Sequence, residues 1–267
     1  MSQLNTSAVA MPFSGWLLIA LLGLSVGSFL NVVIWRLPLM LMAPCKGFNL
    51  CLPASRCRHC ERPLRLWDNL PLLGWIWLRG RCRHCRQAIS RRYPLVELFT
   101  ALTTLWLAWH YPPGITLLAL WLFSWTLIAL SFIDYDHQLL PDNLTQPLLW
   151  GGLLFHLLQS PLAPGDAIAG AMVGYLFFWS LYWLSRWLLK REALGYGDAK
   201  LLAALGAWGG WTILPELLLY ASGAGIAVTL AARCCYGRPL DKPLPFGPFL
   251  ALAGWFCVVG IIDTLPP

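Results

Sequence analysis

The chain alternates between long apolar stretches and short polar connections. Over its 267 residues, eight stretches are dominated by Leu, Ala, Val and Trp and carry few charges, which is typical of membrane-crossing helices. They are residues 13–35, 94–110, 114–133, 144–159, 166–189, 198–210, 212–232 and 246–263. We therefore predict an all-α polytopic membrane protein with about eight transmembrane helices. Stretch 198–210 is well short of the ~20 residues that a perpendicular span needs.

Composition excludes the alternative of one or two soluble domains. Apolar residues make up 58% of the chain and charged residues only 12%, with 16 tryptophans. A soluble domain carries about twice that share of charge. The membrane interpretation therefore does not depend on where any single stretch begins or ends.

The basic residues predict the orientation of these helices. Of the 19 Lys and Arg residues, twelve lie between Arg36 and Arg92, four between 186 and 200, and three between 233 and 242. With a periplasmic N-terminus, all of them fall in or beside cytoplasmic loops, as the positive-inside rule requires. The net charge of +7 is thus an orientation signal first and an attraction to anionic lipid second, and nucleic-acid binding is not expected. Residues 1–12 lack the basic start of a signal peptide, so the first helix should remain as an anchor.

One long polar segment contains a short repeat. The sequence "RCRHC" occurs at 56–60 and again at 81–85. We divide the chain accordingly into an N-terminal anchor (1–37), a cytoplasmic loop (38–93) and a membrane domain (94–267). Two C-x2-C knuckles at this spacing predict a zinc-ribbon-like site, with ligands Cys57, Cys60, Cys82 and Cys85.

The expected metal is structural zinc. Four thiolates complete a tetrahedral shell, whereas a catalytic zinc keeps one position for water. A reducing compartment argues against two disulfides instead. His59 and His84 stay open as substitute ligands, although knuckle residues that face solvent are the simpler interpretation. Ligand spacing is absent at the remaining cysteines, which are Cys45, Cys51, Cys234, Cys235 and Cys257.

Two carboxylates lie where polar loop meets apolar helix. Asp134 directly follows the stretch 114–133, and Asp198 opens the stretch 198–210. Carboxylates this close to hydrocarbon are costly and indicate a functional site. Nearby Asp136 is interpreted as an exposed loop residue, and Asp142 as a helix N-cap.

The sequence around Asp198 supports a functional role but leaves a structural alternative. Asp198 is also a candidate N-cap for the helix that follows. Gly195 and Gly197 exceed what a cap requires, and we expect them to allow close approach of another helix or a peptide. Lys200 lies on another side of the helix and is expected to extend to lipid headgroups.

A pair of carboxyl groups at one depth, on different helices, is equipped for peptide hydrolysis. Two like charges in contact share one proton, so one group activates water while the other polarises the carbonyl. Serine-elbow, H-E-x-x-H and nucleotide-binding glycine motifs are absent. The alternatives are a proton-coupled transporter that uses Asp134 and Asp198 as a proton relay, and a non-enzymatic zinc-bearing assembly subunit.

Nearly end to end, the chain resembles the type IV prepilin peptidases of type IV pilus and type II secretion systems. Besides both knuckles, the resemblance rests on the segments "GSFLNVVIWRLP" (27–38), "DNLPLLGWIWLRGRCRHC" (68–85), "RYPLVEL" (92–98), "FIDYDHQLLPDNLTQPLLW" (132–150), "LGYGDAKLLAALGAWGG" (194–210) and "PFGPFLALAG" (245–254). It implies a membrane-embedded aspartic protease of the GxGD kind with Asp134 and Asp198 as its catalytic pair. Its substrates would be prepilins or pseudopilins, cleaved after the glycine of the leader on the cytoplasmic side of the bacterial inner membrane.

The same resemblance implies a second activity, N-methylation of the new N-terminal residue with S-adenosylmethionine. Only the resemblance points to its location, in the cytoplasmic loop and near Asn31, and the donor site is not identified by any motif. Asn31 is alternatively an interhelical hydrogen-bonding residue, and Glu97 either receives the substrate amine or pairs with loop arginines. The segment 39–56 departs from the family pattern because it is short and apolar and carries two extra cysteines.

Overall fold

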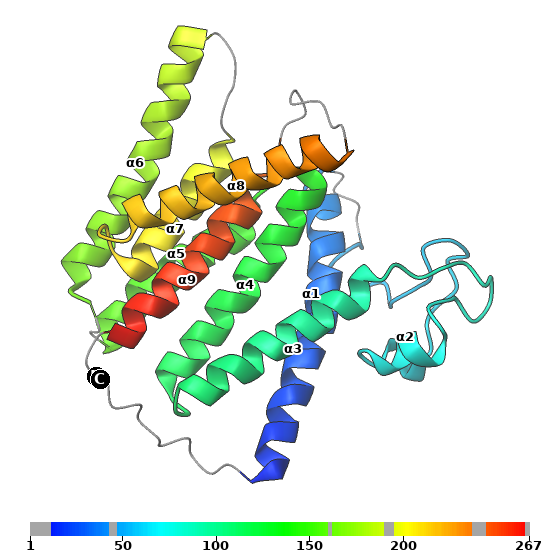
Figure 1. Ribbon diagram of the computed structural model, residues 1–267. Coiled ribbons are helices and arrows are strands. Elements are labelled where there is room, and N and C mark those ends of the chain that lie inside the picture. Colours follow the sequence, from blue (N-terminus) through cyan, green and yellow to red (C-terminus); the bar gives the residue numbers. More distant parts are fainter. Residues whose placement is uncertain (1–11, 43–46, 160–161, 190–194, 237–243, 265–267) are drawn as a thin grey trace. The chain divides into compact units, whose positions relative to one another are not determined.

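The computed structural model describes residues 12–42, 47–159, 162–189, 195–236 and 244–264. Within these ranges the chain is helical and contains no extended β-strand. Figure 1 shows the helices, which are α1 (Phe13–Met42), η1 (Leu66–Asn69), α2 (Leu73–Trp77), α3 (Arg92–His110), α4 (Ile115–His137), α5 (Asp142–Gln159), α6 (Pro164–Leu189), α7 (Tyr196–Gly209), α8 (Leu214–Tyr236) and α9 (Gly247–Thr264). They form two compact units, Met1–Trp125 and Thr126–Pro267. The predictions about residues 1–11 and about Cys45 concern residues outside the described ranges.

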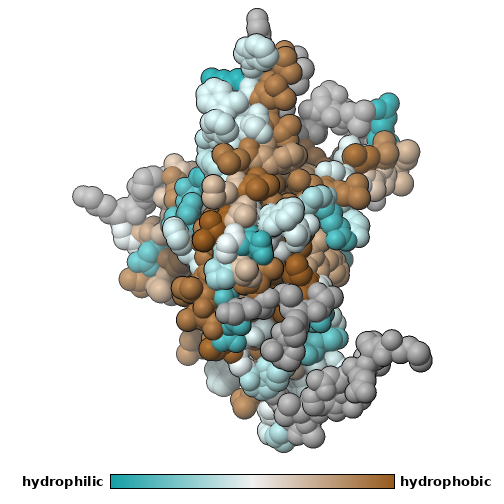
Figure 2. Space-filling model, turned by 90° about the vertical axis from the view of Figure 1, so that its left-hand side faces the viewer, coloured by the Kyte–Doolittle hydropathy of each residue, from teal (hydrophilic) through white to brown (hydrophobic). Residues whose placement is uncertain are grey.

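The predicted helical architecture is confirmed, since each of the eight apolar stretches forms a helix. Four helices, α1, α4, α6 and α8, are long and apolar enough by themselves to cross a membrane. The largest boundary error is at α1, which continues past residue 35 to Met42 with Pro38 inside it. Many apolar side chains are exposed, as lipid contact requires: Figure 2 shows hydrophobic residues interspersed with hydrophilic ones on the visible face, and α6 exposes among others Met172, Phe177, Trp183 and Trp187.

In the first unit, α1 and α3 pack closely because glycines on α1 remove side chains from the interface. A Cβ atom at Gly23 would lie 2.7 Å from the Cα of Ala101, and one at Gly27 would lie 2.6 Å from the Cα of Glu97. These glycines form a G-x3-G motif, which brings the two backbones together. The amide of Asn31 then donates a hydrogen bond to the carbonyl of Tyr93 across the interface, at 3.1 Å. The interhelical interpretation of Asn31 is therefore confirmed.

In the second unit, the short helix α7 is the most buried element. Eleven of its fourteen residues are buried, and it packs against α5, α6 and α9. Its small residues allow this: Gly206 lies against the backbone of Gly170 on α6, and the indole of Trp208 fits over Gly152 on α5. The Trp208 indole also donates to the carbonyl of Leu148 at 2.8 Å. A helix that is apolar all round is buried by neighbouring protein, so α7 need not match the thickness of the bilayer.

A single methyl group at the contact between α6 and α7 should destabilise the second unit. We expect Gly206→Ala to reduce the free energy of unfolding by about 1–3 kcal/mol, because the new Cβ would overlap the carbonyl oxygen of Gly170. Gly260→Ala on α9 is the matched control, since no atom lies within 4 Å of that Cβ position. Thermal unfolding in detergent should therefore show a lower Tm for the first variant alone. Equal Tm values would contradict the close contact.

Candidate functional site

Asp134 is a buried carboxylate near the end of α4. Its side chain belongs to a residue that is 6% exposed, in the last turn of the helix. The backbone N–H of Gly247, the first residue of α9, donates to its Oδ2 at 2.9 Å. A helix N-terminus favours negative charge, so α9 stabilises an ionised carboxylate at this position.

Gly247 is a site residue that sequence reasoning missed. A Cβ at this position would lie 2.7 Å from the carboxylate oxygen of Asp134, so only glycine permits the observed hydrogen bond without displacement. The two residues are 113 positions apart. The segment "PFGPFLALAG" was part of the family resemblance, but nothing in its pattern assigned its glycine to an aspartate on another helix.

Asp198 is buried in the first turn of α7. It is 9% exposed, and its carboxylate accepts a backbone hydrogen bond from Gly195. The N-cap interpretation is wrong, because Gly195 occupies the N-cap and Asp198 is the third helical residue. From there its side chain reaches back to the cap amide, as the acidic residue of a capping box does. Gly197 is closely approached, but by the side chain of Leu140 in the connection between α4 and α5 and not by another helix: a Cβ there would lie 2.8 Å from the Cβ of Leu140. At Gly195 the nearest atom to such a Cβ is Oδ2 of Asp198, at 3.3 Å.

The fold places the two aspartates near enough for their charges to interact. The charge of Asp134 acts on the carboxyl group of Asp198, although the residues lie on α4 and α7. Both side chains are buried. Two buried carboxyl groups that sense each other are the arrangement in which one proton is shared.

The neighbouring charged residues have other roles. Asp136 is exposed, as expected, but it lies in the last turn of α4 and not in a loop. Lys200 does not extend alone to headgroups, because its Nζ lies 2.5 Å from Oδ1 of Asp142. Asp142 is the first residue of α5 and does not act as its N-cap, contrary to the prediction. Its side chain instead forms the ion pair with Lys200, which links the beginning of α5 to the beginning of α7. It leaves Asp198 without a lysine partner from its own helix.

The two C-x2-C knuckles of the first unit have the same backbone structure. In each, the N–H of the first cysteine donates across the turn, from Cys57 to the carbonyl of Arg62 and from Cys82 to that of Gln87. The residue after the second cysteine has a positive φ in both, 55° at Glu61 and 61° at Arg86. Each turn is closed by an isolated antiparallel bridge. The sequence repeat is therefore also a structural repeat.

The four knuckle cysteines lie close enough together to share one metal ion. All four sulfur atoms lie within 4.8 Å of one another. Cys57 and Cys85 are 3.8 Å apart, and Cys60 and Cys82 are 4.0 Å apart. A Zn–S bond of about 2.3 Å implies an S···S edge of about 3.8 Å, so the donor set fits zinc.

Local electrostatics acts in opposite directions on two cysteines of this cluster. Backbone N–H groups of Cys85 and His84 lower the pKa of the Cys82 thiol to about 6, which favours the thiolate that metals bind. At Cys85, the N–H of Gln87 lowers the pKa of the thiol, but desolvation and the other three sulfurs outweigh it and raise this pKa to about 11. The side chain of His84 contacts the guanidinium of Arg62, through Nδ1 at 3.2 Å. Within the described residues, the metal-binding group contains neither this histidine nor His59.

An ion pair between Arg83 and Asp68 stabilises the loop beside the cysteine cluster. The guanidinium of Arg83 forms two hydrogen bonds to Asp68, 3.0 Å from Nε to Oδ2 and 2.5 Å from Nη2 to Oδ1. This contact holds the pKa of Asp68 below its usual value. It ties η1 to the second knuckle, and the bidentate geometry gives the contact a fixed direction.

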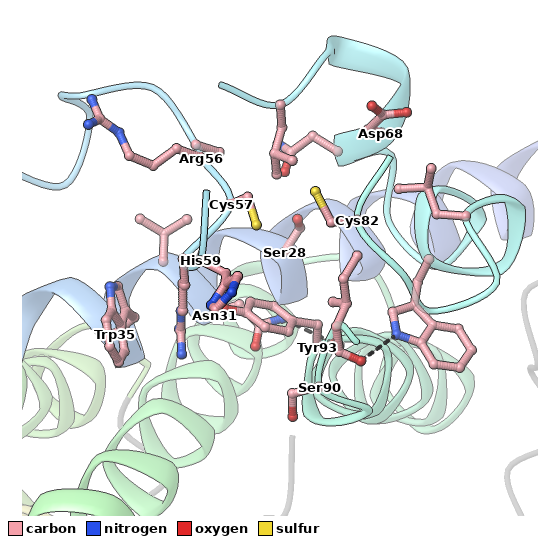
Figure 3. A pocket seen from close by; sticks show the side chains of 18 of the residues that line it. Ser28, Asn31, Trp35, Arg56, Cys57, His59, Asp68, Cys82, Ser90 and Tyr93 are labelled. Carbon is pink, nitrogen blue, oxygen red and sulfur yellow. Dashed lines mark hydrogen bonds between the residues drawn. The ribbon is translucent and has the colours of Figure 1, made fainter. Parts of the chain in front are cut away.

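A cavity of about 480 Å³ lies in the first unit, between the start of α3, the polar face of α1 and the knuckles. Figure 3 shows Asn31 and Trp35 of α1 with Tyr93 in the lower part of the view, and Cys57 and Cys82 above them. Glu97, which the sequence left open, also lines it.

Glu97 does not pair with a loop arginine in the described structure. Its Oε2 accepts the N–H of Leu72 at 2.8 Å, and its carboxylate also bonds to Ser28. These contacts fix the acid at the cavity wall.

Comparisons with known proteins match both units. Residues 21–111, which include all four knuckle cysteines, match the model of the bacterial peptidase A24 N-terminal domain. Residues 121–230, which include both aspartates, match that of the type IV leader peptidase family.

Similar curated proteins cover nearly the whole chain. A protein of Aeromonas hydrophila is 48% identical over 97% of this chain and 95% of its own length. One of Dickeya chrysanthemi is 49% identical over 90% of each. Both are named prepilin leader peptidase/N-methyltransferase. No solved structure matches the chain. At this level of identity, the chain belongs to the type IV leader peptidase family.

Proposed function

We propose that this protein is a membrane-embedded aspartic endopeptidase that removes the leader of type IV prepilins or pseudopilins and then N-methylates the new N-terminus. The observation that carries the peptidase assignment is the pair of buried, electrostatically interacting carboxyl groups, Asp134 and Asp198. Membership of the leader peptidase family and the names of the relatives support both activities. They give no support to a proton-coupled transporter.

The two carboxyl groups divide the work of hydrolysis. The ionised group takes a proton from water, and the protonated group donates to the scissile carbonyl. The N–H of Gly247 holds Asp134 in place throughout. Hydrolysis then needs neither a covalent intermediate nor a metal-bound water. The cleavage point after the leader glycine is part of this proposal and rests on the family resemblance.

Charge distribution supports an active site on the cytoplasmic side of the inner membrane. Asp134 lies in the last turn of α4, and Asp198 lies in the first turn of α7, within the basic segment 186–200. Basic residues are retained on the cytoplasmic side during insertion. From the same charge distribution, we propose that the knuckle loop lies in the cytoplasm and the N-terminus in the periplasm.

The four knuckle cysteines would hold a structural zinc ion. Their sulfur spacing and complete four-sulfur shell support a closed site, and the metal would supply folding energy to a small polar loop. The methylation step would require S-adenosylmethionine, which supplies the transferred methyl group.

A reconstituted reaction tests both activities together. Purified protein in lipid nanodiscs is incubated with a candidate prepilin, with and without S-adenosylmethionine, and the N-terminal mass of the product is measured. We expect cleavage after the leader glycine under both conditions and a further mass increase of one methyl group only with the donor. An intact prepilin under both conditions would contradict the proposed function.

Adding one methyl group at Gly247 should impair cleavage without removing either acid. In Gly247→Ala, the Cβ would displace the carboxylate of Asp134 from the α9 N-terminus. We expect kcat to fall about 10–100-fold, as small misplacements of reacting groups do. Gly225→Ala on α8 is the control, because its Cβ would meet neighbours only at 3.8 Å or more. Unchanged kcat in Gly247→Ala would contradict the positioning role of this residue.

A further inference from the structure

The cavity of the first unit has the size and the lining of a small-molecule site. At about 480 Å³, it falls within the range of roughly 300–1,000 Å³ that is usual for such sites. Ser28, Asn31, Val32 and Trp35 line it at the spacing of one face of α1. The knuckles close another side with Cys57 and Cys82 (Figure 3), so a metal at the cysteine cluster would shape the cavity wall.

One wall carries a carboxylate held in a defined position. Glu97 is 7% exposed, and its bond from the N–H of Leu72 comes from a residue in an unfavourable backbone conformation, with φ 58° and ψ −52°. A leucine persists there only when its surroundings impose it, and such strain is typical of functional sites. The loop is thus arranged around this acid.

Other walls carry cations and aromatic faces. Arg56 and Arg58 line the cavity. The guanidinium of Arg58 lies 3.5 Å from the ring centre of Trp35 and 5.3 Å from that of Tyr93. A third ring, Trp75, is held by a hydrogen bond from its indole N–H to the carbonyl of Ile89. The cavity therefore suits a ligand that combines a cation, a carboxylate and a flat ring.

We propose that this cavity binds S-adenosylmethionine, with Glu97 facing the cationic methionine portion of the molecule. The proposal rests on the methylation activity proposed above, and it identifies the site of that activity within the first unit. S-adenosylmethionine carries a sulfonium and an ammonium group, a carboxylate and an adenine ring, which correspond to the acid, the arginines and the aromatic rings of the cavity. In the transfer, the free N-terminal amine forms a bond to the methyl carbon, the carbon–sulfur bond breaks with its electron pair remaining on sulfur, and the amine releases a proton to solvent.

Direct binding tests the proposal without relying on turnover. Labelled S-adenosylmethionine is titrated into the full-length protein in nanodiscs by equilibrium dialysis. Because Glu97 contributes a charge-assisted contact, we expect Glu97→Gln to weaken binding by about tenfold or more. The amide oxygen of the glutamine can still accept the N–H of Leu72, so the hydrogen bond between the loop and α3 is kept. Glu216→Gln is the matched control, since this exposed acid lies on α8 and contacts Tyr220. It should bind as tightly as the wild type.

A second variant keeps the test decisive if Glu97→Gln alters the fold. Val32→Trp fills the cavity from α1 and leaves Glu97 unchanged. We expect it to abolish donor binding while zinc content and Tm stay at wild-type values. The proposal would be overturned if both variants bound S-adenosylmethionine as tightly as the wild type. If Glu97→Gln loses its zinc, wild-type affinity in Val32→Trp alone would overturn it.

Failure of this inference is distinguishable from failure of the proposed function. If wild-type protein methylates prepilin but both variants bind the donor normally, the methyl donor binds elsewhere and the function stands. If wild-type protein neither cleaves nor methylates a prepilin, the function itself is contradicted.

Discussion

Replacing either Asp134 or Asp198 with asparagine is expected to reduce the rate of prepilin cleavage by about 10³-fold or more, as loss of a general acid or base does. Asparagine has nearly the same shape, and at position 134 its oxygen still accepts the N–H of Gly247. What it lacks is the ability to take or give a proton. Cleavage is measured as single-turnover release of the leader from a purified prepilin.

Asp136→Asn is the matched control for this prediction. The residue has the same chemistry and lies two positions from Asp134, but it is exposed. We expect wild-type cleavage from it. A variant of Asp134 or Asp198 that retains a tenth of wild-type activity would contradict the shared-proton mechanism.

The double variant gives a sharper test of the pair. Residues that act as one unit have non-additive effects, so Asp134→Asn/Asp198→Asn should be no slower than either single variant. Both single variants should also be at least as stable as the wild type, because each removes one of two interacting buried carboxyl groups. Loss of activity accompanied by a lower Tm in both would instead indicate misfolding.

The helices were predictable because lipid leaves a chain few choices. A membrane-crossing backbone must satisfy its own hydrogen bonds, so each apolar stretch had to be helical. The knuckles were predictable for a similar reason: a metal-binding turn needs two cysteines at fixed spacing, and the repeat of "RCRHC" carries that spacing twice. Local requirements of this kind are visible in sequence.

The contacts that complete the two sites were not predictable in this way. The N–H of Gly247 bonds to a carboxylate 113 residues away, and Lys200 pairs with Asp142 across two helices. The N–H of Leu72 reaches Glu97 only because of an unusual backbone conformation. Each depends on how elements pack, and helical periodicity reports which face is apolar but not which neighbour it meets. The position of Asp198 in its helix was also not predictable. The helix begins three residues earlier than an N-cap role for Asp198 would require, and Asp198 is therefore a buried acid in the first turn.

Replacing Cys57 or Cys82 with serine is the second change for which we expect a large effect. Each should reduce bound zinc from about one ion per chain to a small fraction, because three sulfurs do not complete the tetrahedral shell. Cys51→Ser is the control, since Cys51 is exposed and lies outside the four-sulfur cluster. Metal content is measured by inductively coupled plasma mass spectrometry on purified protein.

Loss of the metal should destabilise the first unit more than the second. Structural zinc typically contributes about 10–16 kcal/mol to a small domain, so a loop with little apolar core would lose its structure. Cys57 and Cys82 also line the cavity, and donor binding and methylation should therefore fail along with zinc. Both aspartates lie in the other compact unit, so leader cleavage should decline far less than methylation. Equal loss of both activities would show that the loop is required for cleavage as well, and full methylation without zinc would contradict its structural role.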